Sequence, residues 1–326
     1  MSPADAILSV RDLRVEIPTH RGVVKPVDGV DLDVPRGGAL GLVGESGCGK
    51  SMTLRAIMGL LPGKAHIAGG EVSFDGRAVS PQSLGQLRGA DIGMVFQEPM
   101  TALNPVMRVG DQIAEGPRVR LEQSAGQARE RALELLRLVG IPDPERRYEA
   151  FPHELSGGLR QRIVIAIALA CAPQLLLCDE PTTALDVTIQ DQILHVLARL
   201  RAEMGVSMVL VTHDLAVVAQ TCERVAVMYA ARIVETGTVV EVFGAPRHPY
   251  TRALLRSVPD FDERRAQLES IAGMPPDLVS PPSGCRFHPR CELAHTDCAT
   301  VDPPLAGLGP GRATACRYHQ ELEQRA

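Results

Sequence analysis

The sequence lacks tryptophan and has few aromatic residues of any kind. Phe, Tyr and Trp together make up 3% of its 326 residues, and none of them occurs before Phe74. A long hydrophobic run is also missing. The longest strongly apolar stretch, Ile163 to Ala172, is about half of the ~20 residues that a helix needs to cross a bilayer. We therefore expect no membrane-spanning helix.

The N-terminus lacks the features of a secretory signal. Met1 to Val10 contains Asp5 and no basic stretch that leads into a long apolar core. We therefore expect the protein to stay in the cytoplasm. An excess of positive charge is missing too, because 34 Lys and Arg stand against 39 Asp and Glu, which gives a formal net charge of -5. Without a basic surface to attract its backbone, nucleic acid is a poor candidate for the main partner.

The composition is otherwise that of an ordinary globular protein. Hydrophobic residues make up 45% and charged residues 22%, so the chain should fold, and its length predicts roughly two domains. Eight cysteines are present. In a reducing compartment they are more readily explained as buried thiols or metal ligands than as disulfides.

The hydrophobic pattern predicts a mixed α/β fold. Apolar and polar residues alternate from Ile7 to Val34, which favours half-buried strands of an antiparallel sheet. A short apolar strand, Ala39 to Val43, is followed by a glycine-rich turn and by a helix over Lys50 to Leu61 that Pro62 ends. Three later runs, which are typical of buried parallel strands, are Leu175–Cys178, Met208–Thr212 and Arg224–Tyr229.

Two regions differ from this core. Helical segments rich in Arg, Glu and Leu predict a helical insertion, which we place at about 100–172. Beyond about Gly244, prolines become frequent and four of the eight cysteines occur, which predicts a separate tail module. We set the boundary between a main domain and this extension as 1–245 and 246–326.

The turn after the strand Ala39 to Val43 matches the phosphate-loop pattern G-x-x-x-x-G-K-S, with the strand before it and the helix after it. Its residues are Gly44, Glu45, Ser46, Gly47, Cys48, Gly49, Lys50 and Ser51. Glycines let backbone N–H groups surround a phosphate at a helix N-terminus, Lys50 neutralises the outer phosphates, and the Ser51 hydroxyl joins the shell of Mg²⁺. The sequence therefore predicts an ATP site formed by these eight residues and Met52.

An apolar strand delivers two acids at its C-terminal end, the place where α/β sheets put their ligands. Asp179 is expected to hold Mg²⁺, and Glu180 is expected to polarise the water that attacks the γ-phosphate. The simpler alternative is an acidic pair that caps the next helix.

The segment Leu155-Ser156-Gly157-Gly158-Leu159-Arg160-Gln161-Arg162 resembles the signature of the ABC ATPases. Ser156, Gly157 and Gly158 stand at a predicted helix start, where backbone N–H groups and the helix dipole favour an anion. In the family that anion is the γ-phosphate bound by the other subunit. The resemblance implies a P-loop NTPase (RecA-like) core with an antiparallel β subdomain, a helical ABC insertion and a small Cys/Pro-rich C-terminal extension.

Three single residues stand where this resemblance requires them. Gln97 is similar to the family's Q-loop glutamine, which touches Mg²⁺ and the attacking water. Asp186 resembles the D-loop aspartate that meets the opposite subunit, and His213 resembles the switch histidine that contacts the γ-phosphate. In isolation each would be explained by a surface loop, a helix N-cap or a structural histidine.

One departure from the family concerns adenine. The family usually stacks the base on an aromatic residue before the phosphate loop, and this chain has none there. Ile17, His20 or Arg21 could cover the base instead, and the sequence does not choose among them.

The tail resembles the C-terminal extension of the oligopeptide and dipeptide importer ATPases, a branch that also includes nickel importers. The matching stretch is Arg247-His248-Pro249-Tyr250-Thr251-Arg252-Ala253-Leu254-Leu255. Within this branch the chain is most similar to the dipeptide-permease D-type subunit. The resemblance implies ATP hydrolysis coupled to import of di- or oligopeptides, with nickel or another small solute as the alternative cargo.

Four tail cysteines are separated by five, six and seventeen residues: Cys285, Cys291, Cys298 and Cys316. Four thiolates near cationic residues suit an iron–sulfur cluster, and the spacing is similar to the cluster-bearing tail of some dipeptide importer ATPases. We expect a [4Fe–4S] cluster, with a Zn²⁺ site and unmetallated thiols as alternatives. The other four cysteines lie in core elements and are expected only to pack.

The family resemblance implies a set of partners. These are a second, related ABC ATPase subunit, two transmembrane permease subunits and an extracytoplasmic solute-binding protein, with the chain at the cytoplasmic face of the cell membrane. Two other hypotheses remain: a permease-free ABC ATPase acting on DNA or ribosomes, and a redox sensor that merely binds ATP. One cassette and a negative net charge argue against the first of these.

Overall fold

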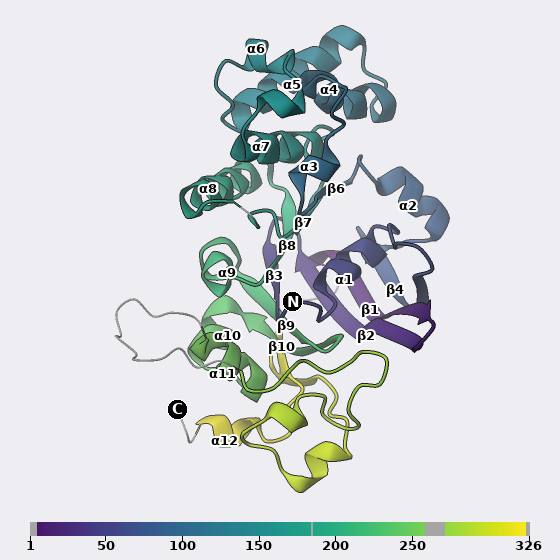
Figure 1. Ribbon diagram of the computed structural model, residues 1–326, viewed down its shortest axis with the longest axis vertical. Coiled ribbons are helices and arrows are strands. Elements are labelled where there is room, and N and C mark those ends of the chain that lie inside the picture. Colours follow the sequence, from purple (N-terminus) through teal and green to yellow (C-terminus); the bar gives the residue numbers. More distant parts are fainter. Residues whose placement is uncertain (1–4, 184, 258–270, 324–326) are drawn as a thin grey trace. The chain divides into compact units, whose positions relative to one another are not determined.

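The computed structural model describes residues 5–183, 185–257 and 271–323 (Figure 1). The chain forms two compact units. Unit 1 consists of residues 1–35, 39–78 and 211–326, and unit 2 of residues 36–38 and 79–210. The phosphate loop and the C-terminal extension thus share unit 1, whereas the acidic strand end and the signature segment belong to unit 2.

Unit 1 contains the predicted antiparallel sheet, in the strand order β2-β1-β4-β5. Its strands are β1 (Ala6–Thr19), β2 (Gly22–Pro35), β4 (His66–Phe74) and β5 (Arg77–Ala78). Alternate residues of β1 are buried on each side of a bulge, Leu8 and Val10 before it and Leu13 and Val15 after it. The expectation of an opening antiparallel sheet is confirmed.

Unit 1 also holds a second set of strands in the order β11-β12-β10-β9-β3. These are β3 (Ala39–Val43), β9 (Arg224–Tyr229), β10 (Arg232–Thr238), β11 (Ala306–Gly309) and β12 (Arg312–Thr314). Its helices are α1 (Lys50–Ile57), α9 (Leu215–Thr221), α10 (Val239–Gly244), α11 (Pro249–Arg256) and α12 (His319–Glu323), with short 3₁₀ turns η3 (His288–Arg290) and η4 (Thr296–Ala299). The strands β3 and β9 are parallel, as expected for an α/β core.

The C-terminal extension is joined to the core of unit 1 through main-chain pairing. Strand β12 pairs antiparallel with β10, so that Glu235 faces Thr314 and Thr236 faces Ala313. The tail therefore continues a core sheet instead of standing apart from it. Residues on both sides of the predicted 245/246 boundary lie in one compact unit, and the boundary itself stays a prediction.

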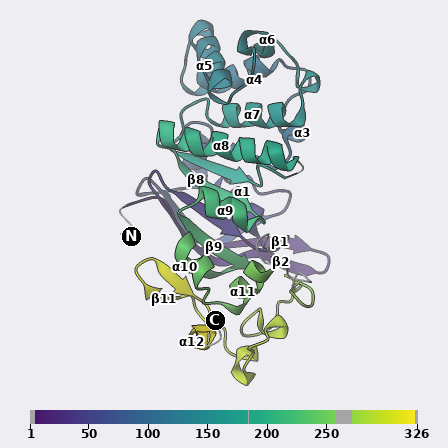
Figure 2. The same cartoon turned by 90° about the vertical axis from the view of Figure 1, so that its left-hand side faces the viewer.

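Unit 2 combines buried strands in the order β8-β7-β6 with a group of helices. Its strands are β6 (Ile92–Val95), β7 (Leu175–Asp179) and β8 (Ser207–Thr212). The last two residues of β8, Val211 and Thr212, belong to unit 1. Its helices are α2 (Pro81–Leu87), α3 (Pro99–Ala102), α4 (Val109–Arg120), α5 (Ala125–Leu138), α6 (Pro144–Tyr148), α7 (Gly157–Ala168) and α8 (Val187–Met204), with the 3₁₀ turn η2 (Pro152–Glu154). Figures 1 and 2 both place α7 between α8 on one side and α4 to α6 on the other. A helical insertion between β6 and β7 was expected and is present.

The helix after the phosphate loop is shorter than predicted. Gly59 adopts a left-handed φ of 62°, and its N–H and that of Leu60 donate to the carbonyls of Ala56 and Arg55. This is the Schellman arrangement, which closes the last turn of a helix. The helix α1 therefore ends at Ile57, and Pro62 is not what ends it.

Within the described residues, none of the helices is both long and apolar enough to span a membrane.

Candidate nucleotide-binding site

The phosphate loop connects the buried strand β3 to helix α1, as the motif predicts. Three of its glycines have positive φ angles, 152° at Gly44, 78° at Gly47 and 113° at Gly49. A β-carbon at Gly44 would lie 2.1 Å from the carbonyl oxygen of Met228, and one at Gly49 would lie 2.0 Å from that of Pro26. At Gly44 and Gly49 the loop therefore has both a conformation and a packing that only glycine allows.

Lys50 is held inside the loop that it is expected to serve. The residue is 4% exposed, and its ammonium group donates to the carbonyls of Gly44 at 2.7 Å and Glu45 at 3.0 Å. The neighbouring Cys48 is buried, and burial raises the pKa of its thiol. Cys48 is thus a packing residue of the loop, and Lys50 supplies its positive charge.

The strand β7 in unit 2 ends in the two predicted acids. All five of its residues are buried, and Asp179 is 2% exposed. Glu180 follows with a positive φ of 46°, which is uncommon for a residue with a side chain. Such strained backbone is often found at functional sites, and here it turns Glu180 away from the line of the strand.

Two predicted site residues of unit 2 lie together. The carboxylate of Glu180 accepts a hydrogen bond from the Gln97 amide at 3.4 Å and a shorter one, 2.7 Å, from the hydroxyl of Thr183. Gln97 follows β6 and is exposed, whereas Glu180 is half-buried. The pair is suited to hold a water molecule near a carboxylate.

The signature segment forms the N-terminus of α7. Ser156 occupies the N-cap position, and its side chain makes no capping hydrogen bond. A β-carbon on Gly158 would lie 2.7 Å from a methyl carbon of Ile189 at the start of α8. Ser156 therefore does not cap α7 with its side chain, and Gly158 allows α7 and α8 to approach each other closely.

Asp186 and His213 are both exposed, Asp186 directly before α8 and His213 directly after β8. Asp186 is the N-cap residue of α8, where its side chain makes no capping hydrogen bond. His213 follows β8, and the next residue, Asp214, caps α9 by accepting from the N–H of Ala216 at 2.9 Å. Ala184, between the acidic strand end and Asp186, lies outside the described residues.

Sequence reasoning missed the residues of the extension that contact the phosphate loop. Arg290 forms two hydrogen bonds with the carboxylate of Glu45, at 2.7 and 2.9 Å. The hydroxyl of Tyr250 accepts the backbone N–H of Glu45 at 2.8 Å. These partners lie 205 and 245 positions apart in the chain, so that no local pattern pairs them.

The four tail cysteines line one small cavity of about 20 Å³, together with His288 and Tyr318. Burial, together with the charges of neighbouring thiolates, raises the pKa of Cys285, that of Cys291 to about 11 and that of Cys316 to about 12. Within the described residues, however, no group of three or more His, Cys, Asp or Glu side chains is arranged to hold a metal ion. The predicted iron–sulfur or zinc site is therefore not supported, although the chemistry of four thiols in one cavity suits both.

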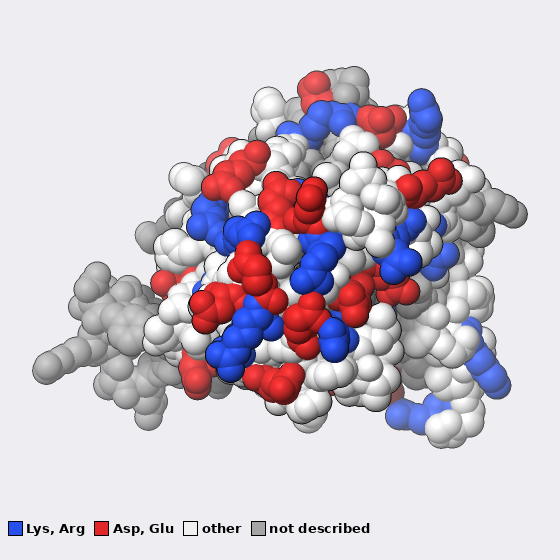
Figure 3. Space-filling model, turned by 90° about the horizontal axis from the view of Figure 1, so that it is seen from above, with Lys and Arg blue, Asp and Glu red and all other residues white. Residues whose placement is uncertain are grey.

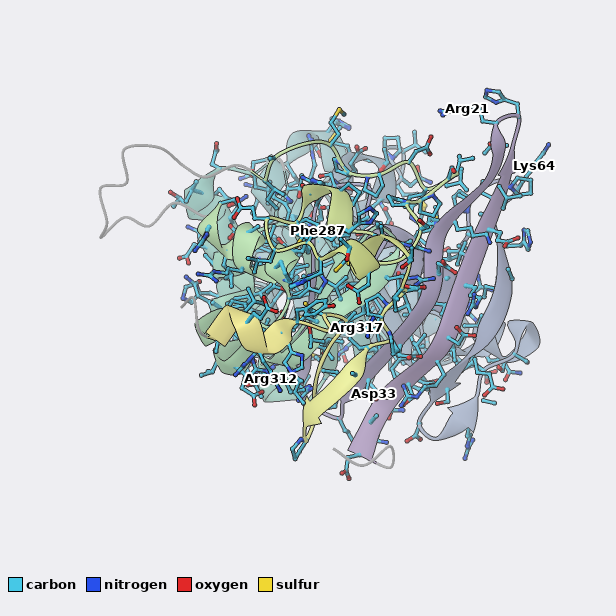
Figure 4. All side chains as sticks on the ribbon, turned by 90° about the horizontal axis from the view of Figure 1, so that it is seen from below. Arg21, Asp33, Lys64, Phe287, Arg312 and Arg317 are labelled. Carbon is cyan, nitrogen blue, oxygen red and sulfur yellow. The ribbon has the colours of Figure 1, made fainter. Side chains whose placement is uncertain are left out.

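The remaining cysteines are buried in the core, as expected. They are Cys48, Cys171, Cys178 and Cys222. Of the three residues considered for covering adenine, Arg21 lies in the β1–β2 turn. Arg21 there pairs with Asp277 of the extension at 2.8 Å, and Figure 4 shows Arg21 at the far end of these strands.

Charged residues on the visible face of the helical segment are mixed in sign. Figure 3 looks from above onto the end at which Figure 1 draws α5 and α6, and blue and red side chains alternate there. Glu149, for example, lies between Arg108 and Arg129. A face of this kind does not offer the continuous positive surface that binds a nucleic acid backbone.

Comparisons with known proteins agree with this geometry. Residues 27–183 match the family model described as ABC transporter, and residues 234–298 match the oligopeptide/dipeptide transporter C-terminal region. The chain is 51% identical to the probable peptide ABC transporter ATP-binding protein y4tR of Sinorhizobium fredii, over 98% of this chain and 97% of the relative. The chain belongs to the ABC transporter ATP-binding protein family. As a member of that family it is an ATP-hydrolysing enzyme that uses ATP and Mg²⁺.

Other ABC relatives cover nearly the same length. The chain is 50% identical to the dipeptide transport ATP-binding protein DppD of Bacillus subtilis, over 92% of this chain and 90% of the relative. Among solved structures, the dimeric ATP-binding cassette MJ0796 in a post-hydrolysis state with ADP and Pi matches with a TM-score of 0.64 and 28% identity, covering 71% of this chain and 98% of that one. The expected mixed α/β fold with a P-loop NTPase core is therefore confirmed.

Proposed function

We propose that this chain is the ATP-hydrolysing subunit of a membrane ABC importer and powers the uptake of di- and oligopeptides. The observation that carries the proposal is the match of residues 234–298 to the oligopeptide/dipeptide transporter C-terminal region. Relatives at 44% to 51% identity are named as peptide or dipeptide transport ATP-binding proteins. The extension is thus the part of this chain that favours peptide as the cargo.

We propose the following roles for the phosphate-handling residues. The backbone N–H groups of the loop from Gly44 to Met52 and the ammonium of Lys50 bind the phosphates of ATP. Ser51, Asp179 and Gln97 hold Mg²⁺, which the nucleotide brings with it. Glu180 takes a proton from the attacking water while Gln97 and Thr183 fix its carboxylate, and His213 stabilises charge on the γ-phosphate.

The signature face is proposed to complete the site of a second subunit. The N-terminus of α7, with Ser156, Gly157 and Gly158, presents N–H groups and the positive end of the helix dipole to a γ-phosphate. Asp186 lies next to Val187, whose apolar side chain is 81% exposed. The N-terminus of α7 and the exposed Val187 both support pairing with another ATPase subunit, which we propose to be a related chain in a heterodimer.

Contact with permease subunits is proposed at the segment after Gln97. Met100 is 64% exposed and Val106 is 79% exposed there. Exposed apolar side chains beside a functional loop favour a protein partner over water. We place two permease subunits on this surface, with a solute-binding protein on the far side of the membrane and the chain at the cytoplasmic face.

We also propose that Cys285, Cys291, Cys298 and Cys316 hold a [4Fe–4S] cluster, with Zn²⁺ as the alternative. The support is chemical, since four thiols line one cavity. Protein purified without oxygen should contain about four iron and four sulfide per chain and lose them in the Cys291→Ser variant. Zinc without sulfide would favour the alternative, and four titratable thiols without metal would exclude both.

Uptake of labelled dipeptide and of labelled nickel tests the cargo. Cells that lack the gene are complemented with wild type, with Glu180→Gln or with a matched surface change, Glu130→Gln on α5. We expect wild type and Glu130→Gln to restore dipeptide uptake and Glu180→Gln to fail. Restored uptake of nickel alone would show that the cargo is a metal ion. If neither dipeptide uptake nor nickel uptake changes, another solute or a permease-free ATPase would be favoured.

A further inference from the structure

We propose that Arg290 of the C-terminal extension is a positioning residue for ATP binding. It neutralises and holds Glu45, the second residue of the phosphate loop, and so prevents this carboxylate from repelling the phosphates of ATP. The inference rests on ATP binding at the phosphate loop and is independent of the cargo.

The ion pair is bidentate and largely removed from water. The two guanidinium nitrogens of Arg290 lie 2.7 and 2.9 Å from the carboxylate oxygens of Glu45. The Arg290 side chain is 6% exposed and that of Glu45 is 22% exposed. Two parallel hydrogen bonds in a partly desolvated place fix both the charge and the orientation of a carboxylate.

Arg290 is itself held by the extension. Its Nε donates to the carbonyl of Ala272 at 2.9 Å, and a terminal nitrogen donates to that of Ile271 at 3.3 Å. Its guanidinium lies 5.8 Å from the ring centre of Tyr229. The hydrogen bond to Glu45 raises the pKa of Arg290, so its positive charge is permanent.

An aromatic cluster anchors the segment that carries Arg290. Phe287, three residues earlier, is 3% exposed and lies 5.2 Å from the ring of Tyr229 and 5.4 Å from that of Tyr250. Figure 4 shows Phe287 surrounded by segments of the extension. Because three aromatic rings pack together here, the segment that carries Arg290 is anchored to the core of unit 1.

Glu45 is also held through its backbone. Its N–H donates to the hydroxyl of Tyr250, and its carbonyl accepts from Lys50 and from the N–H of Cys48. The charge of its side chain, in contrast, is balanced by Arg290 of the extension. If Arg290 is removed, a negative carboxylate remains in a loop built to receive an anion.

A second substitution at Glu45 should therefore restore the MgATP affinity that substitution of Arg290 lowers. Purified full-length chain with Arg290→Met should bind MgATP about tenfold more weakly than wild type, a coupling of ordinary size between two sites. Glu45→Gln alone should stay within about twofold of wild type, since its amide oxygen still accepts a hydrogen bond from Arg290 and the loop gains no negative charge. The double variant should return to within about threefold of wild type, because the repelling charge is gone.

The control variant removes another ion pair between the extension and the core of unit 1. Asp302 of the extension pairs with Arg232 of β10, and Asp302→Asn, which leaves the Arg290–Glu45 pair in place, should leave MgATP affinity unchanged. If Arg290→Met does not fold, Arg290→Gln, which retains a donor for the carbonyl of Ala272, replaces it. Wild type that fails to bind MgATP would refute the ATPase assignment instead of this inference.

Hydrogen exchange supplies a readout that does not depend on activity. By reciprocity, MgATP should slow amide exchange over residues 285–291 at least about threefold in wild type and not in the Arg290 variant. Equal MgATP affinity of Arg290→Met and wild type would overturn the proposal. A double variant as weak as Arg290→Met would overturn it too, because the effect would then be structural.

Discussion

Glu180 shows how a single residue acquires a role that its type does not define. Its φ of 46° places it in the left-handed region, and its carboxylate accepts from Gln97 and Thr183. The preceding Asp179 is buried in β7, while Glu180 is half-buried. Two adjacent acids therefore have different surroundings, which suits one to a metal ion and the other to water.

Replacing Glu180 with Gln should remove hydrolysis and retain nucleotide binding. The amide keeps the size of the side chain and cannot accept a proton, so turnover should fall at least about 100-fold. Phosphate release and MgATP affinity are measured in parallel, with Glu130→Gln as the control on the exposed face of α5. Hydrolysis at a rate close to that of wild type would exclude Glu180 as the base.

Asp28 is a second informative residue, because its buried carboxylate joins the extension to β2. Burial raises the pKa of Asp28, but the hydrogen bonds and charges of Arg286 and Arg232 outweigh this and lower the pKa overall. A lowered pKa in the folded state means that the stabilisation is present above the pKa of the unfolded chain. It is lost as the pH falls through the folded value.

We expect Asp28→Asn to lower the free energy of unfolding by about 2 kcal/mol at pH 7, the usual effect of losing hydrogen bonds between buried charged groups. The difference from wild type should shrink as the pH falls below about 4, the ordinary pKa of an aspartate in the unfolded chain, and on through the lower pKa of the folded state. Thermal unfolding followed at several pH values measures it. A difference that stays constant from pH 7 to pH 3 would show that the charge of Asp28 is not the cause.

At the scale of elements, the phosphate loop depends on neighbours that are distant in the sequence. Gly49 lies against the carbonyl of Pro26 in β2, and Gly44 against that of Met228 in β9. Tyr250 at the start of α11 holds the backbone of Glu45. The strand–loop–helix unit is therefore completed by three elements that its motif does not contain.

Gly49→Ala should abolish MgATP binding and destabilise the protein, because its β-carbon would lie 2.0 Å from the Pro26 oxygen. The matched control is Gly76→Ala, since Gly76 also has a positive φ, of 72°, and an open surrounding. We expect this control to cost only about 1 kcal/mol and to bind MgATP normally. Equal effects of the two substitutions would show that backbone strain, and not the contact with Pro26, matters.

At the scale of the whole molecule, the extension is part of the structure of unit 1. Strand β12 pairs with β10, and the carboxylate of Glu235 in β10, which is 0% exposed, accepts the N–H groups of Arg247 and His248. Burial raises the pKa of Glu235. The core strand thus contains an acid whose hydrogen-bond partners come from beyond the predicted domain boundary.

A chain truncated after residue 245 should therefore fold poorly. It would leave the carboxylate of Glu235 buried without its two N–H donors and expose an unpaired edge of β10. Soluble yield and the thermal unfolding transition measure this. A truncated chain with the wild-type transition temperature would show that the extension is an independent module, as its composition alone predicts.

The sequence by itself determined the α/β class, the opening antiparallel sheet and the elements around the phosphate loop. Local periodicity and the spacing of a glycine-rich motif depend on neighbouring residues, and these are visible in one dimension. It also predicted which residues stand at strand ends, such as Asp179, Glu180 and Gln97. The predicted end of helix α1 was wrong, because the left-handed Gly59 closes the helix before Pro62 is reached.

Only the tertiary structure decided how the extension acts on the rest of unit 1. The contact of Arg290 with Glu45, the pairing of β12 with β10 and the gathering of Tyr229, Tyr250 and Phe287 join residues that are far apart in the chain. Such contacts arise from packing and from satisfying buried charges, and no local pattern encodes them. The sequence predicted a phosphate loop, and the fold determined what holds its second residue in place.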